Sequence, residues 1–180
     1  MPLNPALSFA AFVFWLLALP MDGPLATDLG IRHPSLWFLP AHILALILTV
    51  FPPKALPLQR LTPAAIPGMI LLTLAMAFRP AGAPLFLILL GICAAPLLLA
   101  AGQAMRGAAN PALQAAIGLI AGNSALFLLT IVPPPPPWGW LVAALPLLLF
   151  LRQPYPDQPL LAIPTTVWRY LPLVRIYHLS

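Results

Sequence analysis

Charged side chains are very scarce in this chain, and their scarcity limits the possible folds more than any other feature. Only 6% of the 180 residues are charged, eight Lys or Arg and three Asp, and the sequence has no Glu. A soluble domain has about a quarter of its residues charged, whereas here 62% are hydrophobic. Most of the surface is therefore expected to face lipid. The sequence predicts a multi-pass integral membrane protein, with the inner (cytoplasmic) membrane of a prokaryote as its expected location.

Six apolar segments without charged side chains follow one another along the chain. The predicted spans cover residues 7–21, 36–51, 62–78, 83–101, 112–132 and 138–151. Barrel strands would alternate polar and apolar residues, which these segments do not, so helices remain as the way to satisfy the backbone in lipid. The expected fold class is all-α, a bundle of six transmembrane helices over residues 1–152.

The two ends of the chain carry separate expectations. Residues 153–180 are rich in Pro, aromatic residues and Arg, and are expected to form a cytoplasmic tail at the membrane interface. The first apolar segment resembles the core of a signal peptide in length, but no Lys or Arg precedes Arg32. It is therefore interpreted as a span, with a cleaved signal as the alternative.

Prolines mark several boundaries between these segments. Asn110-Pro111 is expected to open the fifth span, since proline is well tolerated in a first helical turn, and Asp22-Gly23-Pro24 is expected to form a turn. The five prolines of residues 133–137 are expected to form an extended polyproline segment. Prolines inside spans are expected to bend them: Pro40, Pro67, Pro96 and Pro146.

The basic residues predict the topology. With the N-terminus inside, six of the eight basic residues fall on the cytoplasmic side, as the positive-inside rule favours. The two on the other side are Arg32 and Arg79. An even number of spans then places the C-terminus inside as well. The cytoplasmic six are Lys54, Arg60, Arg106, Arg152, Arg169 and Arg175.

Four polar residues are candidate intramembrane sites, because an ionisable or polar group within a span is a functional candidate by default. His42 is the only histidine inside a predicted span, and its ordinary role would be a hydrogen bond to a neighbouring carbonyl. Asp22 lies at the end of the first predicted span. A carboxylate there either takes part in proton or cation coupling or lies in a solvated loop without a functional role. Asn123 and Ser124 are expected to hydrogen-bond across helices.

Small residues indicate close packing in two places. Gly118 and Gly122 form a small-xxx-small pair in the fifth span, which suits helix contact within the bundle, with a dimer face as the alternative. Cys93 is the only cysteine, so it forms no internal disulfide or cysteine metal cluster and is expected to be a packing residue.

The sequence offers no catalytic constellation, and the expectation is that the chain is not an enzyme. Gly122-Asn123-Ser124-Ala125 resembles the serine motif of rhomboid proteases, but that nucleophile needs a histidine base on a later span. The only histidine after Ser124 is His178, in the tail. No metal cluster, phosphate loop or basic run is present, so no metal, cofactor or nucleic acid is expected. A bound lipid or apolar pigment stays open, since apolar grooves bind these without a motif.

The order of several motifs resembles the N-terminal six-helix half of major facilitator superfamily transporters. A proline followed by Asp-Leu-Gly ends the first span, in residues 24–30, and Trp37 enters the second. Gly91-Ile92-Cys93-Ala94-Ala95 resembles the small-residue segment of the family's fourth span, and Trp138-Gly139-Trp140 resembles the start of its sixth. The resemblance implies a six-helix bundle and covers about residues 10–152.

The chain departs from this family where the family carries charge. The loop of residues 51–60 lacks the family's aspartate and glycine, and Leu87 and Leu90 stand near where its fourth span has arginine and glutamine. The predicted function is therefore a non-catalytic membrane subunit that packs against other integral membrane proteins or itself, as an accessory or scaffold component of a larger complex. The alternative is a small-solute transporter that works as a homodimer or as a paired half-transporter.

Overall fold

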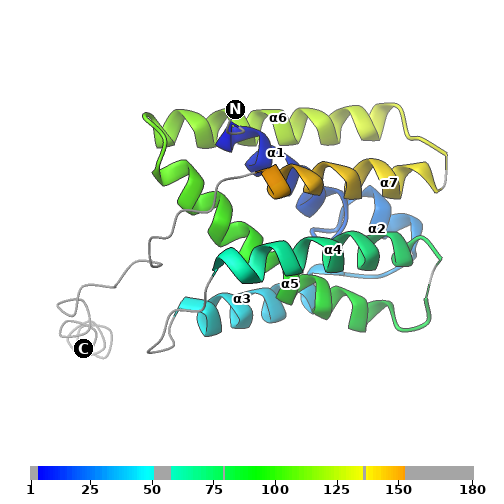
Figure 1. Ribbon diagram of the computed structural model, residues 1–180. Coiled ribbons are helices and arrows are strands. Elements are labelled where there is room, and N and C mark those ends of the chain that lie inside the picture. Colours follow the sequence, from blue (N-terminus) through cyan, green and yellow to red (C-terminus); the bar gives the residue numbers. More distant parts are fainter. Residues whose placement is uncertain (1–3, 51–57, 79, 136, 153–180) are drawn as a thin grey trace, which may run out of the picture.

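The computed structural model describes residues 4–50, 58–78, 80–135 and 137–152, and every regular element in these ranges is helical. The loop of residues 51–57, Arg79, Pro136 and the tail of residues 153–180 lie outside the described residues, as do the expectations for that loop, that side chain and that tail. The expected all-helical class is therefore confirmed for the described part of the chain. In Figure 1, α3, α4, α6 and α7 run roughly parallel, whereas α5 crosses them obliquely.

The helices match the six predicted segments with shifted ends. They are α1 (Pro5–Ala18), α2 (Pro24–Asp28), α3 (Ser35–Val50), α4 (Leu58–Met76), α5 (Ala83–Arg106), α6 (Pro111–Ile131) and α7 (Trp138–Ala144), followed by the 3₁₀ helix η1 (Leu145–Arg152). Two of them, α5 and α6, are long and apolar enough to cross a membrane by length and composition. The shorter apolar helices are α1, α3, α4 and α7 with η1. The helix α2 is little more than a single turn.

The first helix is shorter than the apolar run that predicts it. The helix α1 ends at Ala18, and its C-cap Leu19 is followed by Pro20, which disfavours helical geometry in the residue before it. A turn with Asp22 at φ 56° leads into the short helix α2. Gly23 lies so close to the last turn of α1 that an added Cβ would overlap the carbonyls of Leu17 and Ala18. The expected turn is therefore present, whereas α2 was not expected.

The proline run before α7 is not extended throughout. Pro137 has φ −94° and ψ 10°, which departs from the polyproline conformation near φ −75° and ψ +145°. Its carbonyl accepts a hydrogen bond from Trp140 N at 3.1 Å, and Pro135 O accepts one from Trp138 N at 2.9 Å. The expectation of a polyproline segment is thus wrong at its end, because these carbonyls take part in the first turn of α7.

Asn110 and Pro111 start α6 as expected. The Asn110 side chain accepts a hydrogen bond from Leu113 N at 3.1 Å, and Pro111 occupies the first turn, where its missing N–H costs least. The helix α5 runs five residues beyond the predicted 101, to Arg106, and α4 begins at Leu58, before the predicted 62. At both of these ends the helix continues through residues that lie outside the predicted apolar segment, some of them polar.

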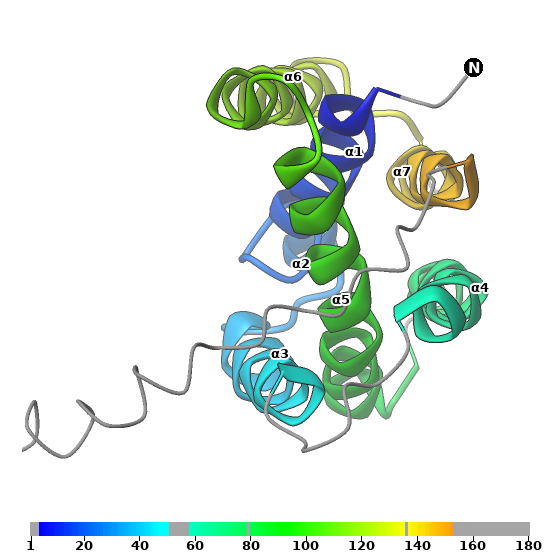
Figure 2. The same cartoon turned by 60° about the vertical axis from the view of Figure 1, so that its left-hand side comes forward.

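The contacts between helices divide the bundle into two equivalent groups of three: α1, α6 and α7–η1 form one group, and α5, α3 and α4 form the other. In that order, each helix of the first group corresponds to a helix of the second. The helix α1 packs on α6 as α5 packs on α3, and α1 packs on η1 as α5 packs on α4. The pairs α1–α5 and α4–η1 join the two groups. Figure 2 shows α5 between α3 and α4, with α6 beside α1 at the other end.

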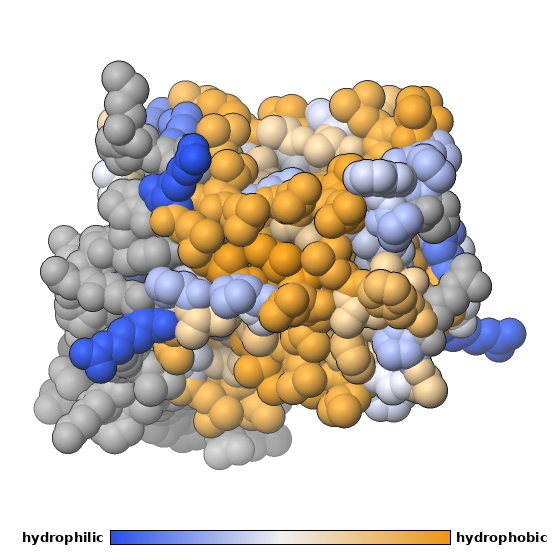
Figure 3. Space-filling model, turned by 45° about the vertical axis from the view of Figure 1, so that its right-hand side comes forward, coloured by the Kyte–Doolittle hydropathy of each residue, from blue (hydrophilic) through white to orange (hydrophobic). Residues whose placement is uncertain are grey.

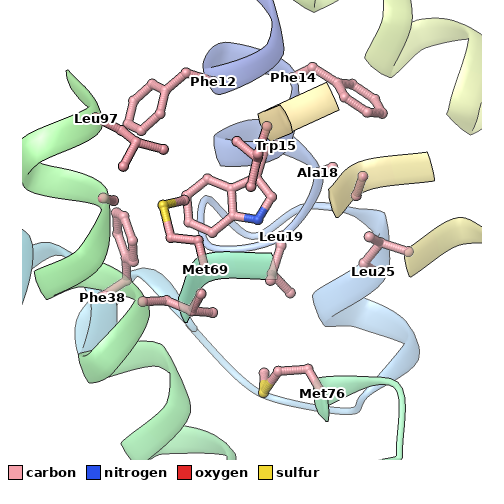
Figure 4. Packing of buried hydrophobic residues seen from close by; sticks show 14 of the residues in the cluster. Phe12, Phe14, Trp15, Ala18, Leu19, Leu25, Phe38, Met69, Met76 and Leu97 are labelled. Atoms are coloured by element: carbon pink, nitrogen blue, oxygen red, sulfur yellow. The ribbon is translucent and has the colours of Figure 1, made fainter. Parts of the chain in front are cut away.

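Aromatic and aliphatic side chains from α1, α3, α4, α5 and α7–η1 form most of the core. The indole of Trp15 is fully buried and lies among Phe12, Phe38 and Met69 (Figure 4). Its ring is 6.1 Å from the ring of Phe12 and 5.9 Å from that of Phe38 between centroids, the second pair edge to face. These are favourable aromatic separations and orientations, so Trp15 joins the two groups of helices at their centre.

Candidate functional site

The surface of the bundle is apolar across its middle. Figure 3 shows hydrophobic residues over the centre of one face, and the most hydrophilic residues toward the two ends of the molecule. The helices run between those ends, and large apolar side chains are exposed along α3 and α6, including Leu36, Leu48, Ile120 and Phe127. A soluble protein would seldom expose so continuous an apolar surface.

His42 is buried at the contact between α3 and α5, with 7% of its surface exposed. Its Nδ1 lies 3.0 Å from the carbonyl oxygen of Gly91, a contact of the general kind that the sequence interpretation expected, without naming the partner. The ring also stacks on Phe38, with centroids 5.2 Å apart and planes at 16°. Both contacts fix the imidazole inside the bundle, which agrees with a role in packing.

Gly91 allows this contact. A Cβ added at Gly91 would lie 2.6 Å from the carbonyl oxygen of Phe38 and 3.0 Å from the backbone nitrogen of His42. The backbones of α3 and α5 therefore approach closely at this point, and only glycine fits between them. The sequence interpretation recognised Gly91 as part of a small-residue segment but did not identify its partner.

The glycines of α6 make the equivalent contact with α1. A Cβ at Gly118 would lie 3.0 Å from Ala6 O and 2.7 Å from the Phe9 ring, and one at Gly122 would lie 2.9 Å from Ala10 O. The small-xxx-small pair thus serves packing inside the bundle. The alternative, a dimer face built on these glycines, is wrong because α1 already occupies them.

Asn123 and Ser124 lie on the exposed side of α6, so they face away from the other helices of this chain. The Asn123 Nδ2 donates to Leu119 O of its own helix at 2.8 Å. Gly118 and Gly122 turn the opposite side of α6 toward α1, and this orientation carries Asn123 and Ser124 outward. The pair of small residues in the sequence was the available signal for this orientation.

Asp22 takes part in a loop contact. Its Oδ2 accepts a hydrogen bond of 3.0 Å from the Ser35 hydroxyl, in an exposed position where the connection between α1 and α3 closes. His42 lies seven residues into α3, about 10 Å further along the helix. The four candidate residues are therefore distributed over a loop, a buried helix contact and an outward face, and do not form one site.

The structure adds polar contacts that the sequence interpretation missed. Trp15 Nε1 donates to Thr73 Oγ1 at 2.9 Å, and Thr62 Oγ1 donates to Pro96 O at 3.3 Å, both buried. Each joins α4 to another helix. The only sequence signal for these two bonds is that Thr62 and Thr73 place a hydroxyl inside an apolar segment. Two buried side-chain oxygens, Ser8 Oγ and Gln114 Oε1, have no hydrogen-bond partner among the described residues.

Two grooves occupy equivalent places in the two groups of helices. One, with a volume of about 610 Å³, lies between α1, α6 and α7–η1, and includes Phe14, Ala125 and Pro146. The other, of about 510 Å³, lies between α5, α3 and α4, and includes Ala41, Ala64 and Cys93. Their walls are almost wholly apolar, and neither includes His42, Asn123 or Ser124. Cys93 also lies 3.5 Å from the position of a Cβ at Gly68, in agreement with a packing role.

Within the described residues, no three His, Cys, Asp or Glu side chains lie close enough together to hold a metal ion. Comparison with known proteins adds no assignment: no protein-family model, curated protein or solved structure matches the chain.

Proposed function

We propose that this chain is a non-catalytic, multi-pass integral membrane protein that packs against other membrane proteins as an accessory or scaffold subunit. In this arrangement all six apolar segments cross the bilayer, with α7 and η1 together forming the last crossing. The shorter helices then span by means of the apolar residues that flank them, or by local thinning of the bilayer. The scarcity of charge and the exposed apolar surface support the membrane setting.

The observation that carries the proposal is that the polar side chains at three contacts inside the bundle are bonded by neighbouring helices. His42 faces Gly91 O and stacks on Phe38, Trp15 bonds Thr73, and Thr62 bonds Pro96. A transporter needs polar groups that face a cavity its substrate can enter, whereas the two grooves are apolar. Groups that bond one another across helices stabilise a fixed packing, which is what a scaffold requires.

A second candidate, a transporter acting as a homodimer or paired half, is favoured by one observation. The two groups of three helices have equivalent neighbours. Each helix lies three crossings along the chain from its counterpart, so the two groups would be inverted in the membrane relative to each other. Inverted three-helix repeats are built into each half of major facilitator transporters, so the repeat supports the resemblance seen in the sequence. The repeat supports the architecture of a half-transporter, which the scaffold subunit and the transporter would share.

Membrane extraction followed by purification tests the proposal. Alkaline carbonate should leave the chain in the membrane pellet, and purification in a mild detergent should recover it with a stoichiometric membrane partner or a second copy. Recovery as a lone monomer would contradict the scaffold role. Reconstitution in liposomes separates the two candidates, since solute uptake that requires the purified complex would favour the transporter.

A further inference from the structure

The outward face of α6 carries polar side chains in the middle of an apolar helix. Asn123 and Ser124 are both exposed. Asn123 lies about 18 Å from the start of α6 and about 12 Å from its end, at 1.5 Å per residue. In the multi-pass arrangement proposed above, on which this inference rests, the amide lies at the depth of the hydrocarbon core, which is about 30 Å thick.

The hydrogen bond within α6 uses only part of the Asn123 amide. Its Nδ2 donates to Leu119 O at 2.8 Å, while an amide has two N–H groups and an oxygen that accepts. Thr130, on the same side of the helix, donates its single hydroxyl proton to Leu126 O at 2.9 Å. Thr130 therefore has its donor satisfied, whereas Asn123 presents hydrogen-bonding capacity to acyl chains that offer no partner.

The rest of this face is suited to helix contact. Ile120 and Phe127 lie one turn to either side of Asn123 and are 68% and 64% exposed. The helix contains no charged residue from Pro111 to Ile131. Its opposite side is taken up by α1 through Gly118 and Gly122. Figures 1 and 2 both show α6 at the edge of the bundle.

We infer that the outward face of α6, centred on Asn123 with Ile120 and Phe127, binds the same face of a second copy of this chain. An amide both donates and accepts hydrogen bonds, so the Asn123 amides of two copies satisfy each other without any other type of side chain. A two-fold axis along the membrane normal brings the same residue of each copy together, so that the two Asn123 side chains pair at the axis. The apolar side chains above and below exclude lipid from the pair.

Energy transfer between donor-labelled and acceptor-labelled full-length copies in liposomes tests this dimer. Wild type should show transfer above the random-collision level, and dilution with lipid should reduce it along a monomer–dimer curve. The variant Asn123→Leu should raise the dissociation constant by about 3- to 30-fold, the range expected for a hydrogen bond between membrane helices. Asn123→Gln, which keeps an amide, should retain the dimer.

Thr130→Val is the matched control. It removes a hydroxyl from the same face of α6, but one already bonded to Leu126 O, and should leave the dissociation constant within about 2-fold. Cross-linking gives a second measurement. In a Cys93→Ser background, Ile120→Cys should form a disulfide dimer under mild oxidation, and Leu44→Cys, 57% exposed on α3, should not.

The outcomes separate this inference from the proposed function. Extraction of the chain by carbonate would overturn both. A chain that stays in the membrane and purifies with a different protein, while its own copies show only random transfer, would overturn the dimer and leave the proposed function standing. Equal dissociation constants for wild type and Asn123→Leu would likewise overturn the dimer through α6.

Discussion

Trp15 donates its indole N–H to the hydroxyl of Thr73 across 58 positions of the chain, at 2.9 Å and in a fully buried setting. The bond joins α1 to α4 at the level where Trp15 also contacts Phe38 of α3. One side chain thereby connects three helices. The centre of the bundle is thus held by a specific polar contact as well as by apolar packing.

Replacing Thr73 by Val should destabilise the bundle by about 1–3 kcal/mol, because it leaves the buried indole N–H without an acceptor. Thermal unfolding in detergent, followed by circular dichroism, measures the change. Thr73→Ser keeps the hydroxyl and should lie closer to wild type. In a Trp15→Phe background, Thr73→Val should cost less, since no donor is left unpaired. Equal costs in both backgrounds would show that the hydrogen bond contributes nothing.

Gly91→Ala should destabilise the protein by about 1–3 kcal/mol, the usual cost of overpacking. The added Cβ meets backbone atoms of Phe38 and His42, which cannot rotate away, so α3 and α5 must separate. Gly102→Ala is the matched control in the same helix, since nothing lies within 4 Å of its added Cβ. That variant should be neutral or slightly stabilising, because alanine favours helix. A comparable loss in both variants would refute close packing at Gly91.

His42→Phe should retain most of the stability. The phenyl ring can keep the stack on Phe38, and the variant loses a hydrogen bond worth about 0.5–1.5 kcal/mol. His42→Ala should cost more, about 2–4 kcal/mol, because the removed ring leaves a cavity. Unfolding midpoints for the two variants give the comparison. If His42 serves proton coupling instead, the phenylalanine variant should abolish solute uptake in liposomes without loss of stability.

The sequence predicted the elements better than their ends or partners. Asn110-Pro111 was recognised as a helix start because a capping side chain followed by proline acts locally. The early end of α1 had a local signal as well, in Pro20, but the apolar run to Met21 concealed it. Hydropathy identifies residues that are apolar enough for the hydrocarbon core and does not identify the end of a helix. It therefore placed the start of α4 too late, at residue 62.

The candidate residues were harder to interpret, because their roles depend on which way a helix is turned. Gly118 and Gly122 were correctly recognised as contact residues, yet the identity of α1 as their partner comes only from the fold. That partner decides that Asn123 and Ser124 face outward. The Trp15–Thr73 bond depends on long-range packing in the same way, since neither residue indicates the other in sequence.

The central claim, that the chain crosses the membrane several times with its N-terminus inside, is tested most directly by cysteine labelling from one side of the membrane. In a Cys93→Ser background, Asp28→Cys and Ala109→Cys place single thiols at exposed positions, at the last residue of α2 and between α5 and α6. An impermeant maleimide added to intact cells should label Asp28→Cys, whereas Ala109→Cys should be labelled only after the membrane is opened. Labelling of both positions from the outside, or of neither until the membrane is opened, would contradict the account.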